Sequence, residues 1–333
     1  MLTVCSMITV AQESQTSYNF LRLPVSAHAA ALGGNNVSLI ENDEALIFHN
    51  PALLSSIDDK TILFNFMNYM SGANTASAAF NRNIKERASV AASAQYVNYG
   101  KMKETTADNV QIGEFSAKDI AVCGYFSYLL TDKIAGGICA KFITSYIGSY
   151  NSIAMGVDLG LNYYDPNKEW SIGLVAKNLG GQLKAYDDDY EKMPLDVQVG
   201  VSKRLTHTPF RFSATLVNLT NWDEKFINHL SIGADIILSQ QIWVGAGYNF
   251  RTNNQMKIST SSEDGGSHGA GLTLGAGINL ERFKLNVAYG KYHVSSSSLL
   301  INAAYSLWFN KKEYGLLILD SFTTVANEVF HAR

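Results

Sequence analysis

Apolar and polar residues alternate strictly along most of the chain after about residue 60. In residues 153–163, apolar side chains occupy every second position, and Ala, Gly, Asp and Asn occupy the positions between them. The same two-residue period recurs in 195–202, 272–280 and 283–290. Because successive side chains of a strand point to opposite faces of a sheet, this pattern predicts β-strands with one apolar and one polar face.

Fourteen segments of this kind are predicted. Most are about 9 to 11 residues long or longer, which is the length that a tilted strand needs to cross a membrane, whereas strands of soluble proteins have about 5 or 6 residues. The predicted strands cover 60–70, 75–83, 87–99, 119–130, 133–146, 150–164, 169–179, 193–205, 209–218, 229–238, 241–250, 268–280, 283–292 and 298–309.

The predicted connections alternate in length. Every second connection is a tight turn, and the other set includes four long loops at 100–118, 180–192, 219–228 and 251–267. This alternation, with an even number of antiparallel strands, is typical of outer-membrane barrels. We therefore expect an all-β protein: a 14-stranded antiparallel transmembrane β-barrel over 60–309, with its short turns in the periplasm and its long loops outside the cell.

A soluble β-sandwich or propeller also alternates apolar and polar positions, but its solvent face should be rich in Lys, Glu and Thr. Here the polar face is mostly Gly, Ser, Ala and Asn. Charged residues make up only 17% of the chain, against about a quarter in soluble domains. This composition favours a confined lumen behind the polar face.

Charge and hydropathy exclude two further classes. The net charge of −3 and the lack of a Lys/Arg-rich block argue against nucleic acid as a partner. No apolar run reaches the 18 or so residues of a membrane-spanning helix, which argues against a helical membrane protein.

The first residues form two segments before the predicted barrel. Residues 1–11, MLTVCSMITVA, have the character of the end of a secretory signal peptide, with an ordinary first strand as the alternative. Residues 12–59 are expected to form a compact plug, or hatch, in the lumen, with a loose periplasmic arm as the alternative. In either case this N-terminus is expected on the periplasmic side.

Two helical signals favour the compact plug. Pro24 is expected to open a short helix that Gly33 and Gly34 end. Further on, Asn50 can cap a second helical turn while Pro51, which has no N–H group to leave unsatisfied, takes its first position before Ala52.

Residues 20–55 carry a family resemblance through Ser-Ala…Ala-Leu-Gly-Gly and Asn-Pro-Ala-Leu-Leu. This stretch resembles the PorQ/PorV family of type IX secretion outer-membrane proteins of Bacteroidetes, within the FadL-like barrel class. The chain length, the fourteen strands and the loop after Lys101 favour the PorQ side of that family. The chain continues past the predicted last strand with residues 310–333, which would be a periplasmic latch or a gene-model artefact.

The resemblance implies a non-enzymatic subunit of the cell-surface attachment complex, without a cofactor. Its implied partners are a PorZ-like surface protein, a PorU-like sortase and a PorV-like shuttle, together with outer-membrane lipid and lipopolysaccharide. The FadL-like relatives imply that residues 50–52 belong to a lumen hatch. They also supply the alternative function, which is transport of hydrophobic compounds.

Seven charged residues are predicted to face the lumen and to pair there in a salt-bridge network that braces the wall and plug. A selectivity ring for a solute is the alternative, although such rings favour one sign of charge. The cations are Lys141, Lys177, Arg211 and Lys284, and the anions are Asp158, Asp196 and Asp235.

Partner-docking residues are expected on the long loops. Asp187, Asp188 and Asp189 form an acidic run in one of them. Trp222 and Phe226, four residues apart in another, suggest a helical turn that presents an aromatic pair, either to a partner or to the barrel rim.

We find no catalytic or metal-binding constellation in the sequence. Residues 265–269 match the G-x-S-x-G pattern, but a loop before them and a predicted strand after them lack the strand-to-helix turn that this motif needs. The seven histidines show no paired metal spacing. Cys123 and Cys139 are predicted to face inward, nearly opposite each other, which leaves a disulfide or two free thiols open.

Overall fold

The computed structural model describes residues 16–70, 72–108, 110–239, 241–256, 269–293 and 296–307. The predicted signal peptide 1–11 and the tail 310–333 lie outside these ranges. Most of the long loop 251–267 and most of the G-x-S-x-G motif do so too.

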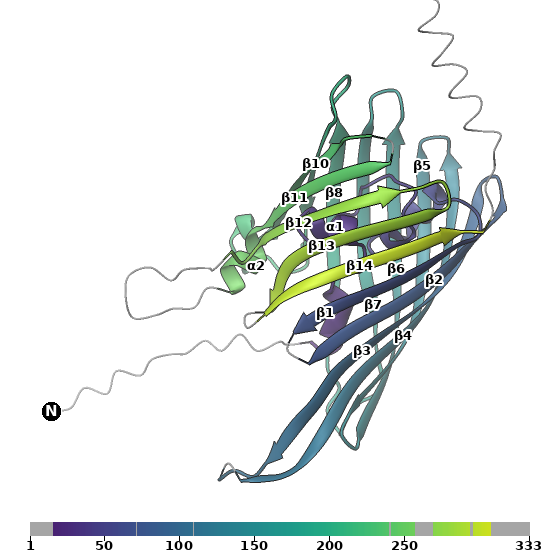
Figure 1. Ribbon diagram of the computed structural model, residues 1–333. Helices are drawn as coiled ribbons and strands as arrows, with labels where there is room; N and C mark the ends of the chain where they lie inside the picture. The colour runs from purple at the N-terminus through teal and green to yellow at the C-terminus, as the bar shows by residue number, and fades with distance from the viewer. Residues whose placement is uncertain are drawn as a thin grey trace, which may run out of the picture.

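Fourteen antiparallel strands close into a barrel (Figure 1). Each strand pairs with its neighbours in sequence, and β1 pairs with β14 from Thr61 opposite Ser306 to Asn68 opposite Leu299. The predicted 14-stranded barrel is confirmed. The strands are β1 (Thr61–Met70), β2 (Ala73–Lys85), β3 (Ala88–Thr105), β4 (Gln111–Thr131), β5 (Ile134–Ile147), β6 (Tyr150–Asp165), β7 (Trp170–Lys184), β8 (Asp196–Arg204), β9 (Phe210–Leu216), β10 (Leu230–Ile237), β11 (Ile242–Asn249), β12 (Leu272–Asn279), β13 (Phe283–His293) and β14 (Ser296–Ser306).

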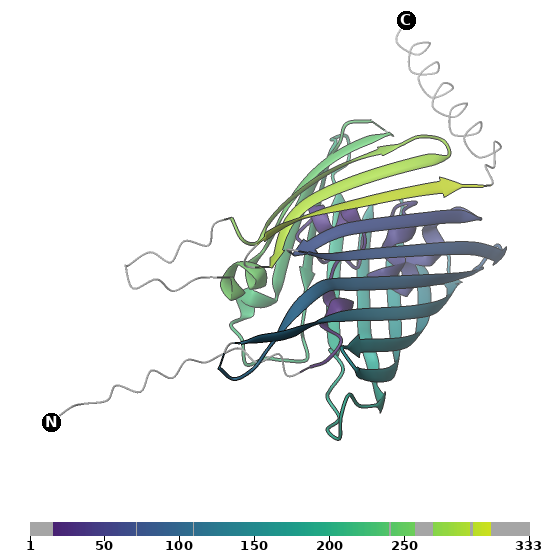
Figure 2. The same ribbon diagram turned by 60° about the horizontal axis from the view of Figure 1, so that its bottom comes forward.

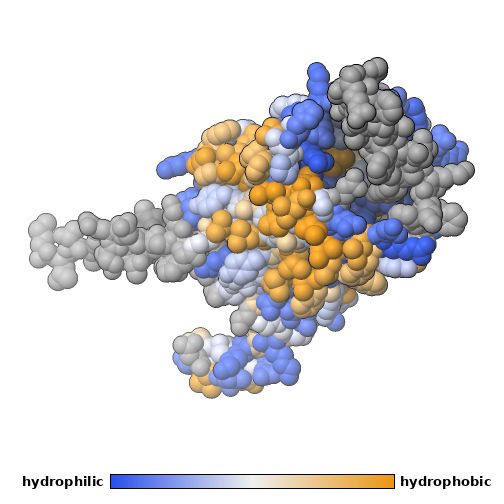
Figure 3. All heavy atoms as spheres, turned by 45° about the horizontal axis from the view of Figure 1, so that its top comes forward, coloured by the Kyte–Doolittle hydropathy of each residue, from blue (hydrophilic) through white to orange (hydrophobic). Residues whose placement is uncertain are grey.

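The two faces of the wall differ sharply in chemistry. On β6, for example, Leu159 points outward and is 46% exposed, whereas its neighbour Asp158 is only 3% exposed. In the space-filling view, apolar side chains form a band over the strands and hydrophilic residues gather beyond it (Figure 3). A wall that is apolar outside and polar inside suits contact with hydrocarbon. Among the described residues, no helix has the length and apolar character needed to cross a membrane.

The connections divide between two ends of the barrel. The long-loop end carries the β1–β2, β3–β4, β5–β6, β7–β8, β9–β10, β11–β12 and β13–β14 connections, and the short-turn end carries the other six. The expected loop at 100–118 is largely strand. From Lys101 opposite Ser116 to Thr105 opposite Gln111, β3 and β4 continue past their neighbours as a projecting hairpin (Figure 1). Apolar alternation could not predict this extension, because both faces of the hairpin are open to solvent and neither needs to be apolar.

The N-terminal segment, residues 16–60, runs inside the barrel (Figure 2). Its helical turns are η1 (Asn19–Arg22), α1 (Ala27–Ala31), η2 (Glu44–Phe48) and η3 (Pro51–Ser56). Two more helical elements, η4 (Phe226–His229) and α2 (Phe250–Gln255), lie in connections at the long-loop end. The first helix does not begin at Pro24. Ser26 caps it instead by accepting a hydrogen bond from the Ala29 N–H, at 3.2 Å.

This segment spans the barrel from one end to the other. At the long-loop end, the Ser17 N–H donates to the Lys192 carbonyl, at 3.0 Å. At the short-turn end, the Leu307 N–H donates to the Lys60 carbonyl, at 2.9 Å. The segment therefore starts at the same end as the long loops. If the long loops face outside the cell, residue 16 lies on that side as well. The expectation of a periplasmic N-terminus together with external long loops is therefore wrong for residue 16.

Candidate functional site: the lumen and its N-terminal segment

Asn50, Pro51 and Ala52 lie against the inner wall where β5 and β6 carry glycine. Asn50 caps η3 by accepting from the Ala52 N–H at 3.0 Å, and Pro51 takes the first position of that turn. The Asn50 side-chain amide also donates to the Leu161 carbonyl of the wall, at 3.2 Å. A Cβ atom at Gly160 would clash with Asn50, and one at Gly137 would clash with Pro51 and Ala52. Because these two glycines have no Cβ atom, the segment can approach the wall backbone closely at this point.

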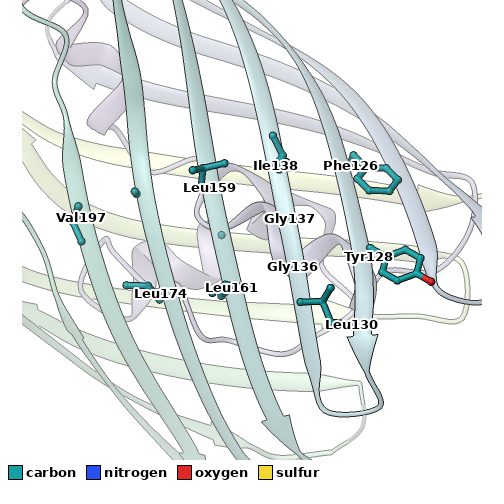
Figure 4. A pocket seen from close by; sticks show the side chains of 12 residues that line it. Phe126, Tyr128, Leu130, Gly136, Gly137, Ile138, Leu159, Leu161, Leu174 and Val197 are labelled. Carbon is teal, nitrogen blue, oxygen red and sulfur yellow. The ribbon is translucent and has the colours of Figure 1, made fainter.

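The outer side of this wall holds an apolar groove of about 530 Å³. Gly136, which points outward, leaves room between the neighbouring apolar side chains (Figure 4). Inward and outward glycines are adjacent here, so only backbone separates the N-terminal segment from the lipid-facing groove. Its lining includes Phe126, Leu130, Ile138, Leu159, Leu161 and Leu174.

Gly33 and Gly34 end α1 in the left-handed region, with φ of 96° and 85°. The Gly33 carbonyl accepts from the Ser231 hydroxyl and from the Asn249 side-chain amide, each at 2.9 Å. Its N–H donates to the Thr273 hydroxyl at 3.0 Å. The end of α1 is thus tied by its backbone to three consecutive strands, β10, β11 and β12.

Four charged side chains meet between the N-terminal segment and the wall. We call them the charge cluster: His28 and Glu41 from the segment, with Arg211 and Asp235 from β9 and β10. His28 Nε2 lies 2.7 Å from Asp235 Oδ2, and its Nδ1 lies 3.0 Å from Glu41 Oε2. Arg211 Nη2 lies 2.7 Å from Glu41 Oε1 and also pairs with Asp235. Two cations and two anions alternate, so the buried charges balance.

The cluster keeps His28 charged. Burial opposes the charge, but Glu41 and the hydrogen bond to Asp235 outweigh it and raise the pKa of His28 to about 9. Burial also acts against a charged Glu41, yet Arg211 and His28 hold the pKa of this carboxyl well below its usual range. The Trp243 indole covers the imidazole, with ring centroids 3.6 Å apart. Charge pairing and stacking therefore fix α1 to the wall.

Lys141 and Asp158 form a second buried pair, on β5 and β6. Their Nζ and Oδ2 atoms are 2.7 Å apart. Asn178 links the pair to β7, because its side-chain oxygen accepts from Lys141 at 2.8 Å and its N–H donates to Asp158 at 2.7 Å. Asn178 has a φ of 61° and lies where β7 bulges against β6.

The remaining predicted lumen charges do not join a single network. Lys284 donates to the Asn42 carbonyl of the N-terminal segment. Asp196 and Lys177 are opposite each other on β8 and β7, but no ion pair joins them. Asp196 instead accepts from the Gln198 side chain and from the Asn218 N–H, each at 2.6 Å.

The sequence interpretation missed His28, Glu41 and Trp243. A histidine among alanines in a short helix was considered only as a metal ligand, although its polar ring inside an apolar helix also signals a buried partner. Among the described residues, no group of three or more His, Cys, Asp or Glu side chains is arranged to hold a metal ion.

Three other titratable groups of the N-terminal segment are buried. Burial, assisted by Asp43, raises the pKa of Glu44 to about 8, and neither carboxyl oxygen has a hydrogen-bond partner among the described residues. Burial also raises the pKa of Asp43. Burial and then Lys177 lower the pKa of His49 to about 3. Burial thus favours the uncharged forms of both Glu44 and His49.

The predicted docking residues lie on exposed connections. Asp187, Asp188 and Asp189 are exposed in the β7–β8 connection. Trp222 and Phe226, in the β9–β10 connection, are 63% and 60% exposed. The expected helical turn over both is wrong, because η4 begins only at Phe226. The Trp222 ring instead lies beside His229, with centroids 5.4 Å apart, so neighbouring loop packing sets its position.

Cys123 and Cys139 both face inward but are diagonal neighbours. Cys123 is opposite Lys141, and Cys139 is opposite Tyr125. Both are buried free thiols in this structure. The two cysteines are thus offset by two residues in the register of β4 and β5, and of the two alternatives left open by the sequence this structure has the free thiols.

A closed antiparallel barrel of fourteen strands with an apolar outer surface defines an outer-membrane β-barrel protein. Residues 123–309 match the family described as type IX secretion system membrane protein PorP/SprF. The chain belongs to this family, which confirms the predicted connection to type IX secretion. No curated protein matches the chain.

Solved structures of similar fold come from channels and transporters. The Pseudomonas putida toluene transporter TodX shares 14% identity, with a TM-score of 0.56 over 85% of this chain and 97% of its own. The CymD monoaromatic hydrocarbon channel shares 13%, with a TM-score of 0.57 over 85% and 97%. A Pseudomonas aeruginosa FadL homologue shares 10%, with a TM-score of 0.53 over 85% and 98%. At these identities the likeness concerns the fold alone.

Proposed function

We propose that the protein is a non-enzymatic outer-membrane subunit of the type IX attachment complex, of the PorQ kind, that anchors surface partners which process and attach secreted cargo. The observation that carries this proposal is the occupied lumen. The N-terminal segment is bound to the wall through its backbone, through the charge cluster and through the glycine contacts of Asn50. A barrel filled and fastened in this way suits an anchor better than an open pore.

The long-loop end would face outside the cell and carry the partners. Three of its projections suit docking: the β3–β4 hairpin and the β7–β8 and β9–β10 connections. The hairpin exposes Val110 and Ile112, and the β9–β10 connection exposes Trp222 and Phe226. Exposed apolar and aromatic side chains are the usual anchors of protein interfaces. The apolar outer band would contact outer-membrane lipid and lipopolysaccharide.

Affinity purification from solubilised envelopes, followed by mass spectrometry, tests this proposal. Replacing residues 186–191 and 221–226 with Gly-Ser linkers should abolish recovery of a PorZ-like surface protein, and with it of PorU-like and PorV-like partners. A matched replacement of the β6–β7 turn, 166–169, at the short-turn end should preserve recovery. If the partners are recovered equally from both variants, or from neither although the barrels are folded, the anchoring role is wrong.

A second candidate is transport of hydrophobic compounds, and one feature of the wall favours it. Pairing of β7 with β8 ends at Lys177 and Asp196, although β7 continues to Lys184. Beyond that point only side chains bridge the gap, such as the Asn178 amide that donates to the Pro194 carbonyl at 3.0 Å. Uptake of a radiolabelled fatty acid or toluene, lost in a deletion strain and restored by the chain, would favour transport. Unchanged uptake in that strain would exclude it.

A further inference from the structure

A polar cavity of about 840 Å³ opens between the N-terminal segment and the connections of the long-loop end. Part of its lining is charged. The cations are Arg22, Lys177, Lys192 and Arg251, and the anions are Asp196, Asp223 and Glu224. Four cations against three anions leave the lining with one positive charge in excess.

Lys177 is the most notable of these residues. It is 8% exposed, yet its side-chain ammonium makes no hydrogen bond or ion pair with any of the described residues. The nearest anions are engaged elsewhere: Asp158 pairs with Lys141, and Asp196 accepts from Gln198 and Asn218. A buried ammonium without a partner is costly, so a partner is expected from outside the chain.

Arg22, from η1 of the N-terminal segment, is the second unpaired cation of this cavity. Its Nε is buried and has no hydrogen-bond partner in the described part of the chain. Its electrostatic neighbours are Arg251, Asp196 and Glu224. Glu224 pairs with Arg251 at 3.2 Å and does not pair with Arg22. Asp196 lies near both unpaired cations, since it neighbours Arg22 and is opposite Lys177.

We propose that this cavity binds one carboxylate, held between Lys177 and Arg22 and entering from the long-loop end. A carboxylate matches the single excess charge. A phosphate dianion would exceed it and would face repulsion from Asp196 and Glu224. The ligand is either a small organic acid or the C-terminal carboxylate of a peptide chain. The site does not depend on the anchoring role, because it is built by this chain alone.

Binding to the purified full-length protein in a non-ionic detergent tests the proposal. The probe is a short Gly-Ser peptide with a neutral N-terminal dansyl label and a free C-terminal carboxylate, compared with its C-terminal amide by fluorescence titration. The acid should bind, and the amide should bind about tenfold more weakly or worse, because charged hydrogen bonds are lost.

Variants locate the site. Lys177→Gln should weaken binding of the acid by about tenfold or more, and Lys177→Arg should restore most of it. Lys103→Gln removes the same charge at an exposed position on the β3–β4 hairpin, outside the cavity, and should change binding less than about twofold. Heat-modifiable migration on gels verifies that each barrel is folded.

Competition identifies the source of the carboxylate. Displacement of the probe by acetate indicates a small acid, whereas resistance to acetate indicates a chain terminus, and both outcomes support the site. Equal binding of acid and amide, lack of binding by the folded wild-type protein, or stronger competition by inorganic phosphate than by acetate at equal ionic strength would overturn it.

Discussion

The imidazole of His28 stacks on the indole of Trp243 with the two ring planes 3° apart and their centroids 3.6 Å apart. The indole N–H donates to the Asn286 side-chain oxygen at 3.1 Å, so a residue of β13 holds this ring in place from within the wall. The carboxylates of Glu41 and Asp235 approach the edge of the same imidazole. The His28 side chain thus joins α1 to β10 and β11. We therefore expect that loss of the charge cluster releases the N-terminal segment more readily than loss of any other contact.

Replacing Asp235 with Asn should loosen the N-terminal segment. His28 and Arg211 would then share one carboxylate, and removing one member of a buried ion pair typically costs about 3–5 kcal/mol. Limited trypsin digestion of the folded barrel, followed by mass spectrometry, should show faster cleavage after Arg22. The same substitution at the exposed Asp187 should leave the cleavage rate unchanged, and equal protection in both variants would contradict a role for the cluster.

The hold on the segment should weaken at alkaline pH. The pKa of His28 is raised from an ordinary value near 6.5 to about 9. Its stabilising contribution is therefore complete below about pH 6.5 and is lost as the pH rises through 9. Ion conductance of the barrel in planar bilayers should be low at pH 7 and should rise near pH 9.

The variant His28→Gln separates this effect from other alkaline titrations. Its conductance should already be higher at pH 7 and should show no step near pH 9. A step of the same size in the variant would mean that another group controls the segment.

The sequence predicted the strands well because a barrel wall imposes one rule on every strand. Outward positions meet lipid and inward positions do not, so a two-residue period is forced on segments such as 153–163. The β3–β4 hairpin escaped the prediction because it leaves the wall, and beyond Lys101 the rule no longer applies.

The charge cluster shows where such reasoning ends. The orientation of Arg211 and Asp235 toward the lumen follows from strand parity. Their partner His28, however, lies 207 residues from Asp235 in sequence. No local spacing links a helix of the N-terminal segment to one particular strand, because that choice depends on the path of the segment through the closed barrel.

Glu44 should make the protein less stable as the pH rises from about 4.5 to 8. Its pKa is raised to about 8 in the folded protein, so over this range the folded state holds a proton that the unfolded state has lost. Glu44→Gln mimics the protonated form. The melting temperature of this variant, relative to the wild type, should therefore increase between pH 5 and pH 8.

Glu86→Gln is the matched control for Glu44, because Glu86 is exposed in the β2–β3 turn. It should leave the pH dependence of the melting temperature unchanged. If both variants behave like the wild type, Glu44 is ionised in the folded protein and the expected desolvation is absent.

Gly160→Ala should displace the Asn50-Pro51-Ala52 turn without preventing the barrel from forming. The added Cβ would clash with the Asn50 side-chain oxygen and press on the Pro51 ring, so the cap of η3 and the contact with the Leu161 carbonyl would both be lost. Gly124→Ala is the matched control, because a Cβ there meets nothing within 4 Å. Native-state hydrogen exchange should show faster exchange of the Ala52 and Leu53 amides in Gly160→Ala only. Unchanged exchange, with both barrels folded, would mean that the glycines of β5 and β6 do not set the position of the segment.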